Sequence, residues 1–125
     1  MDKKSLAVQY KRSGQNCCQA VISAYKDELG IDELTAKKLG SAFGAGMGTM
    51  QGNCGALIGA GIVLGMLEYK GSPISPKSRK LITGFTERCG SDTCVEIKGV
   101  LTGKVLCSCD DCVANAVEVL EGIIK

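Results

Sequence analysis

The chain has 125 residues, of which 45% are apolar and 22% charged, a composition typical of one folded domain and too apolar for a disordered chain. Its net charge of +2 is too small to predict a nucleic acid or a membrane surface as a partner. Histidine is absent, which excludes Ser-His-Asp and Cys-His catalysis and any zinc or haem site with a histidine ligand. We expect a single domain over residues 1–125.

Glycines, prolines and capping residues divide the sequence into short segments whose apolar residues recur at helical spacing. A glycine-rich loop over residues 44–53 lies between two of these segments, and its glycine spacing does not match a nucleotide-binding motif. The predicted helices cover residues 6–12, 17–29, 33–43, 54 to about 69, 76 or 77 to 88, a short segment from 93 to 97, and about 109–124.

Capping residues mark several of the predicted helix ends. Asn16, Asp32 and Asp92 are good N-caps, because their side-chain oxygens accept hydrogen bonds from the free N–H groups of a first turn. Gly30 suits the left-handed conformation that ends the second helix. Asp110 suits the first turn of the last helix, where the helix dipole favours a negative charge.

Alternating β-branched residues are nearly absent, so the pattern predicts an all-α fold, a compact bundle of about five to seven short helices. The exception lies near residues 100–106, where Val100-Leu101 and Val105-Leu106 are suited to a minor short strand pair. The most apolar run, residues 54–67, has the length of a buried helix and is too short for a membrane span.

The N-terminal segment has neither the apolar region nor the cleavage site of a secretory signal, so we expect a cytoplasmic protein without a membrane partner. Structural disulfides are rare in that compartment, and a high cysteine content there favours metal binding or redox thiols. The eight cysteines are therefore the expected source of chemistry, and no catalytic residue is predicted.

Most of the cysteines fall in the first turns of predicted helices, namely Cys17, Cys18, Cys54, Cys94, Cys109 and Cys112. A helix start presents free N–H groups and partial positive charge, which lower the pKa of a thiol and stabilise a thiolate-bound cluster. Cysteines that serve only as small apolar residues would instead be expected in the middle of a helix, on its buried face. The placement favours a chemical role.

The densest group is the run Cys107-Ser108-Cys109-Asp110-Asp111-Cys112. Cys109 and Cys112 stand three residues apart, so in a helix they share a face and can meet or ligate one ion. No second C-x-x-C pairs with them, which argues against a zinc ribbon, and no βαβ unit accompanies them as in thioredoxin.

Two segments resemble a known family. Residues 16–21, Asn-Cys-Cys-Gln-Ala-Val, resemble its N-C-x-Q-A-V segment, and Cys54-Gly-Ala-Leu-Ile-Gly59 matches its CGAxxG motif. Cys94 and Cys109, followed by an amphipathic helix, resemble the remaining two cysteines. Over nearly its whole length the sequence resembles the bacterial C_GCAxxG_C_C family of redox-active proteins, and it is similar to the C-terminal domain of split-Soret cytochromes.

The resemblance implies an iron–sulfur cluster, for which [2Fe–2S] is one candidate. The haem part of the split-Soret cytochromes does not carry over, because the chain has neither a histidine nor a C-x-x-C-H motif. The implied cofactor and metal ligands are Cys17, Cys54, Cys94 and Cys109. The sequence adds cysteines beyond this pattern: Cys18, Cys107 and Cys112 are expected to be redox or accessory thiols, and Cys89 is expected to matter little.

Three functions stay open from the sequence. The first is electron transfer or redox sensing by a bound iron–sulfur cluster, and the second is thiol–disulfide redox chemistry. The third is a structural zinc site with four cysteine ligands, or simply a set of buried thiols. The sequence does not identify a redox partner protein, and it leaves a homodimer open.

Overall fold

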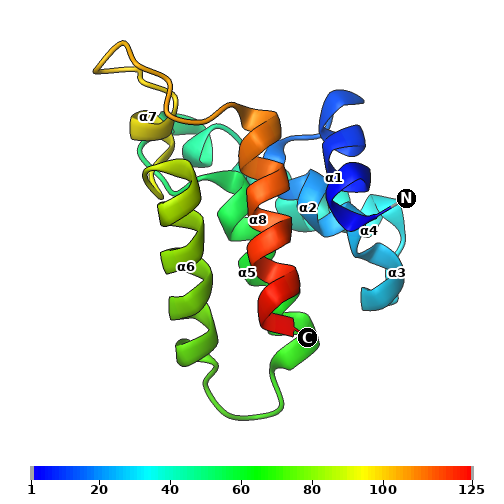
Figure 1. Cartoon of the computed structure of the whole chain (residues 1–125). Coiled ribbons are helices and arrows are strands. Elements are labelled where there is room, and N and C mark those ends of the chain that lie inside the picture. The colour runs from blue at the N-terminus through cyan, green and yellow to red at the C-terminus, as the bar shows by residue number, and fades with distance from the viewer. Residues whose placement is uncertain (1, 125) are drawn as a thin grey trace.

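The computed structural model describes residues 2–124, which form an all-α structure (Figure 1), as predicted. The six longer helices are α1 (Lys3–Arg12), α2 (Cys17–Ala24), α4 (Glu33–Gly40), α5 (Gly55–Glu68), α6 (Ser75–Cys89) and α8 (Cys109–Ile124). Two four-residue helices, α3 (Lys26–Leu29) and α7 (Cys94–Ile97), complete the set in the described residues. Short 3₁₀ and π turns, η1 (Ser41–Phe43) and η2 (Gly46–Met50), lie between α4 and α5.

The predicted second helix is broken at Tyr25, which separates α2 from α3. Tyr25 leaves helical geometry with φ −106° and ψ 12°. Its ring is buried in the core, while its hydroxyl donates a hydrogen bond to the Glu121 carboxylate at 3.0 Å. The break therefore places an aromatic ring between α2 and α8. As predicted, Gly30 adopts the left-handed conformation that ends α3.

Two of the three predicted N-caps are confirmed. Asn16 and Gln19 form a reciprocal capping box at the start of α2, and Asp32 accepts a hydrogen bond from the Thr35 N–H at 2.8 Å. The prediction for Asp92 was wrong, because α7 begins one residue later and its N-cap is Thr93. The carbonyl oxygen of Asp92 instead accepts a hydrogen bond from the backbone N–H that precedes α5.

The predicted strand pair near residues 100–106 is also wrong, since the described residues contain no strand. Gly99 and Gly103 both have positive φ values, and the N–H of Gly103 donates to the carbonyl of Gly99 at 2.8 Å, so the segment folds as successive turns. Val100 and Leu101 are exposed. A two-stranded hairpin without a buried face is marginal in water, which explains why turns are preferred.

α5, α6 and α8 run side by side through the molecule (Figure 1), and α2 packs against α5 while α1 packs against α8. Their shared core is aliphatic, with Val63, Leu64, Leu81, Val117 and Leu120 buried. No helix of the part that the structure describes is long and apolar enough to cross a membrane.

Glycine on α5 permits the close approach of α2. A Cβ atom at Gly59 would lie 2.8 Å from the carbonyl oxygen of Cys18, which is too close for any side chain. A Cβ atom at Gly61 or Gly65 would meet nothing within 4 Å, so those two glycines are not required by packing.

The direction of the three long helices determines where the cysteines meet. α5 and α8 begin at the end of the molecule where α6 ends, and α7 and the loop before α5 lie at the same end (Figure 1). Cysteines at two helix starts and one helix end are therefore gathered into one region.

Candidate thiolate centre

The four cysteines that the sequence marks as ligands lie at this end, each at the start of a different helix. We call them the quartet: Cys17 in α2, Cys54 at the N-cap of α5, Cys94 in α7 and Cys109 in α8. Cys54 and Cys94 are buried, and Cys17 and Cys109 are half-buried. All eight thiols of the chain are free rather than joined in disulfides.

Backbone hydrogen bonds hold two members of the quartet in register. The N–H of Cys54 donates to the carbonyl of Asp92 at 2.8 Å, and the N–H of Cys94 donates to the carbonyl of Gly52 at 3.0 Å. Between them Asn53 and Thr93 form a single antiparallel bridge. The segments that precede α5 and α7 are therefore clamped together, so the positions of the two thiols depend on each other.

The glycine-rich loop closes over Cys94. Gly46 has φ +58°, and a Cβ atom there would lie 2.7 Å from the Cβ of Cys94. Ala45, Met47 and Met50 also have positive φ values, which non-glycine residues rarely adopt. The Sδ of Met50 lies 3.7 Å from the Sγ of Cys94. The loop therefore packs backbone and a thioether against one thiol.

Negative charge on one member of the quartet affects the ionisation of the others. Burial raises the pKa of Cys17 to about 12, and the neighbouring Cys109 and Cys54 contribute in the same direction. Burial likewise raises the pKa of Cys94, with added contributions from Cys54 and Cys109. Each of these two thiols thus lies within electrostatic range of the same pair, which links all four.

Cys54 behaves differently from the other two. The neighbouring Cys112 thiol is the main cause that lowers the pKa of Cys54 to about 7 against the effect of burial, and backbone N–H groups of Ala56 and Leu57 contribute in the same direction. The expected stabilisation of a thiolate by a helix start is therefore found at Cys54. At Cys17 and Cys94 burial outweighs it, which corrects the expectation for those two.

Lys98, which ends α7, supplies positive charge to the region and was not singled out from the sequence. Burial acts to lower its pKa, but a hydrogen bond with Cys109 and the charges of Cys112 and Cys54 raise it overall. Its Nζ lies 3.9 Å from the Sγ of Cys112. Because Lys98 follows Cys94 by four residues, the i, i+4 spacing was the available sequence signal.

The remaining cysteines include a compact group that we call the trio: Cys89, Cys107 and Cys112. Their three Sγ atoms all lie within 4.8 Å of one another and are buried, so they could hold a metal ion. Cys107 and Cys112 were expected to be accessory thiols and Cys89 to matter little. Cys89 ends α6, so it does not belong to the pattern of cysteines at helix starts.

The trio and the quartet differ in spacing and are connected. No second group of three potential ligands meets the 4.8 Å limit within residues 2–124, so the quartet thiols are spread more widely than those of the trio. Cys112 affects the ionisation of both Cys54 and Cys89, so it joins the two sets. Cys18 stands apart as a fully buried thiol in the aliphatic core, and burial raises its pKa to about 12.

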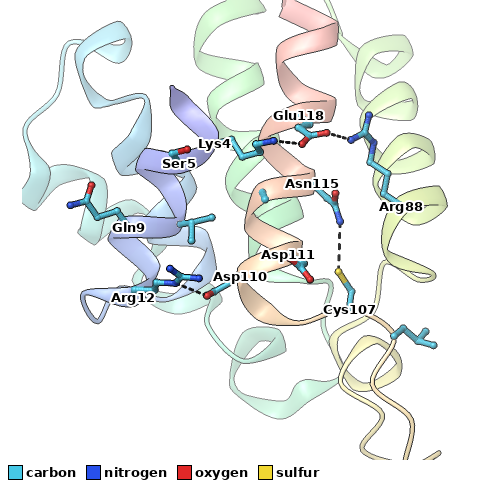
Figure 2. Close-up of a pocket in the computed structure, with 13 residues that line it drawn as sticks. Lys4, Ser5, Gln9, Arg12, Arg88, Cys107, Asp110, Asp111, Asn115 and Glu118 are labelled. Carbon is cyan, nitrogen blue, oxygen red and sulfur yellow. Dashed lines mark hydrogen bonds and ion pairs between the residues drawn. The ribbon is translucent and has the colours of Figure 1, made fainter. Parts of the chain in front are cut away.

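An open groove of about 780 Å³ leads to the trio. Figure 2 shows it with α1 and α6 on either side of α8, and Glu118 of α8 contacts both Lys4 and Arg88 across it. Cys107 lines the groove, and Asn115 directs its amide toward the Cys107 thiol. The groove therefore provides a path from solvent to an otherwise buried sulfur group.

Comparison with known proteins gave one match. The model of a family described as "Putative redox-active protein (C_GCAxxG_C_C)" matches residues 15–123, which include every cysteine of the chain. The search of curated proteins and the search of solved structures gave no match.

Proposed function

Because the chain belongs to the C_GCAxxG_C_C family of redox-active proteins, we propose that the quartet binds an iron–sulfur cluster for electron transfer or redox sensing. When bound, such a cluster accepts and donates single electrons. The protein supplies the thiolates, the hydrogen bonds to sulfur and the surrounding charge, which together set the reduction potential. A compartment that keeps thiols reduced, such as the cytoplasm, suits a chain with eight free cysteines.

The observation that carries the proposal is the convergence of four thiols from four separate helices. A single zinc ion with bonds of about 2.3 Å brings tetrahedral sulfur ligands to within about 3.8 Å of each other. The quartet is spread more widely than the 4.8 Å of the trio. A cluster with two or more iron atoms spaces its thiolate ligands more widely than one ion does, so the quartet fits a cluster better.

The surroundings of the quartet also favour an anionic cofactor. Backbone N–H groups of Ala56 and Leu57 point to Cys54, and the Lys98 ammonium lies within electrostatic range of the thiols. These groups stabilise the negative charge that four thiolates bring. Cys17 and Cys109 are half-buried, so we expect a redox partner protein to exchange electrons at their side of the site.

The test is anaerobic purification, followed by the visible spectrum and by iron, acid-labile sulfide and zinc content per chain. We expect a brown protein with matched iron and sulfide. Cys54→Ser and Cys17→Ser should lose both, and Cys18→Ser, which alters the adjacent core thiol, should keep both. A colourless, iron-free protein, or full iron content in Cys54→Ser, would contradict the assignment.

Thiol–disulfide chemistry is the second candidate, and one observation favours it. A hydrogen bond from Cys112, with further ones from Asn115 and Cys107, lowers the pKa of Cys89 to about 6 against the effect of burial. A thiolate beside two thiols is the arrangement that forms a disulfide on oxidation. Thiol counting on the iron-free chain checks it, because this candidate predicts the reversible loss of two thiols with a defined potential.

A further inference from the structure

The trio has the spacing of a mononuclear site. The limit of 4.8 Å on all three sulfur separations is close to the spacing of about 3.8 Å that one tetrahedral zinc ion with thiolate ligands requires. The three sulfur atoms come from the end of α6, the loop before α8 and the first turn of α8. Small side-chain rotations are therefore enough to bring all three onto one ion.

Each sulfur of the trio has an N–H donor from a neighbouring side chain. The Nδ2 of Asn115 lies 3.5 Å from the Sγ of Cys89 and 3.7 Å from the Sγ of Cys107. The Nζ of Lys98 lies 3.9 Å from the Sγ of Cys112. Cysteines that only fill space in a core need no such donors, whereas metal-bound thiolates are commonly stabilised by them.

The ligand type and the net charge limit which metal ions the trio could bind. Three sulfur donors exclude hard cations such as magnesium and calcium, which require oxygen. Three thiolates and a divalent cation leave one negative charge, and the Lys98 ammonium beside Cys112 offsets it. A monovalent cation would leave twice that charge in a buried region, which is costly.

We propose that the trio is a second metal site, adjacent to the quartet but with three ligands of its own, and that it binds one thiophilic divalent cation such as zinc. The groove in Figure 2 is the entry path, because Cys107 lines it while Cys89 and Cys112 are buried behind. Three protein ligands leave one coordination position for water, as in exchangeable zinc sites.

The test is a cobalt(II) titration of the reduced full-length chain carrying Cys54→Ser, which removes a quartet ligand and leaves the trio intact. We expect one cobalt per chain, with the charge-transfer absorption of cobalt–thiolate bonds, and its displacement by zinc. Adding Cys107→Ser should abolish this absorption, and adding Cys18→Ser should not. Asn115→Ala should weaken zinc binding by about 10–100-fold, because it removes the donors to two ligands.

A measurement on the unsubstituted chain avoids any folding defect of the variants. Zinc should slow the alkylation of Cys107, which lines the groove, and mass spectrometry reads this rate residue by residue with and without zinc. Cobalt absorption that survives Cys107→Ser, or alkylation of Cys107 at the same rate with and without zinc, would overturn the proposal. Iron content in Cys107→Ser reports on the quartet alone, so failure of the two sites can be told apart.

Discussion

The two ends of the bundle made by α5, α6 and α8 are built from different atoms. At one end thiols, amide N–H groups and the half-buried Lys98 lie among the packed side chains, and at the other the buried groups are hydrocarbon, with Leu64 of α5 and Leu120 of α8 both fully buried. Burial of one large aliphatic side chain contributes roughly 1.5–3 kcal/mol, whereas burial of a thiol such as Cys17 or Cys94 raises the free energy of its ionised form. The aliphatic end holds the fold together, so the thiol end can be arranged for chemistry.

The two ends also differ in backbone strain. Every non-glycine residue with positive φ in the described range, Ala45, Met47 and Met50, lies in the loop at the thiol end. Such residues each cost on the order of 1 kcal/mol and persist where surrounding structure holds them. Here the loop is held against Cys94. Strain is thus located where the thiols are positioned, and it is absent from the described part of the aliphatic end.

The largest expected effect comes from weakening the aliphatic end. Leu64→Ala should lower the free energy of unfolding by about 2–5 kcal/mol, because it leaves a cavity between packed helices. Met66→Ala on the same helix is half-exposed and should change it by less than about 0.5 kcal/mol. Urea unfolding measures both. Iron lost per folded chain in Leu64→Ala would mean that the two ends are not independent.

A smaller effect is expected where α5 crosses α2. Gly59→Ala should lower the free energy of unfolding by about 1–3 kcal/mol, because the added methyl group would clash with the Cys18 carbonyl oxygen. Gly61→Ala, two residues away on the same helix, should instead raise the free energy of unfolding by about 0.5–1 kcal/mol. Its methyl group would meet no atom within 4 Å, and alanine has a higher helix propensity than glycine. Thermal unfolding of the pair should therefore give shifts of opposite sign. Equal shifts would contradict the packing described for this crossing.

The thiol end should give the metal-free chain a pH dependence that the aliphatic end cannot. The pKa of Cys89 falls from 9.0 to about 6 on folding, so the folded chain binds fewer protons between these values. Stability should rise from about pH 6 to about pH 9 and be lost as pH falls through about 6. Unfolding experiments across this range measure it, and Cys89→Ala should reduce the slope to the smaller part that Cys54, with its pKa of about 7, contributes. An unchanged slope in that variant would rule out Cys89 as the source.

The smallest effect is expected at the groove between the two regions. Glu118 contacts Lys4 at 2.7 Å and also pairs with Arg88, which links α8 to α1 and α6. All three side chains are substantially exposed, so Glu118→Gln should cost no more than about 1 kcal/mol. The difference should shrink at high salt, because salt screens exposed charges. A salt-independent loss would instead point to altered packing of α8.

The sequence predicts local features of this molecule well. The caps at Asn16 and Asp32, the stop at Gly30 and the extent of α8 depend on neighbouring residues, and all are as expected. The placement of cysteines at helix starts also follows from the same local signals. Ligation of a cofactor by the quartet stays a prediction.

The features that were missed depend on contacts between distant segments. Cys89 joins Cys107 and Cys112 only because α6 ends where α8 begins, and no spacing in the sequence contains that information. The Asp92 side chain suits an N-cap, but the Asp92 carbonyl accepts a hydrogen bond from the N–H of Cys54, and Thr93 is the N-cap of α7. The lowered pKa of a thiol likewise depends on which neighbour donates to it, and this outweighs its position on a helix.

α8 packs against α1, the first helix, although α8 is synthesised long after it. The two sets of thiols are therefore incomplete during much of synthesis. Cys17 and Cys54 leave the ribosome well before α8, which carries the last thiols of both the quartet and the trio. A nascent chain therefore exposes several reactive thiols until α8 has been synthesised and has packed in place. Chains that lack α8 cannot complete either set of sulfur atoms, so both sites form only after this helix has docked.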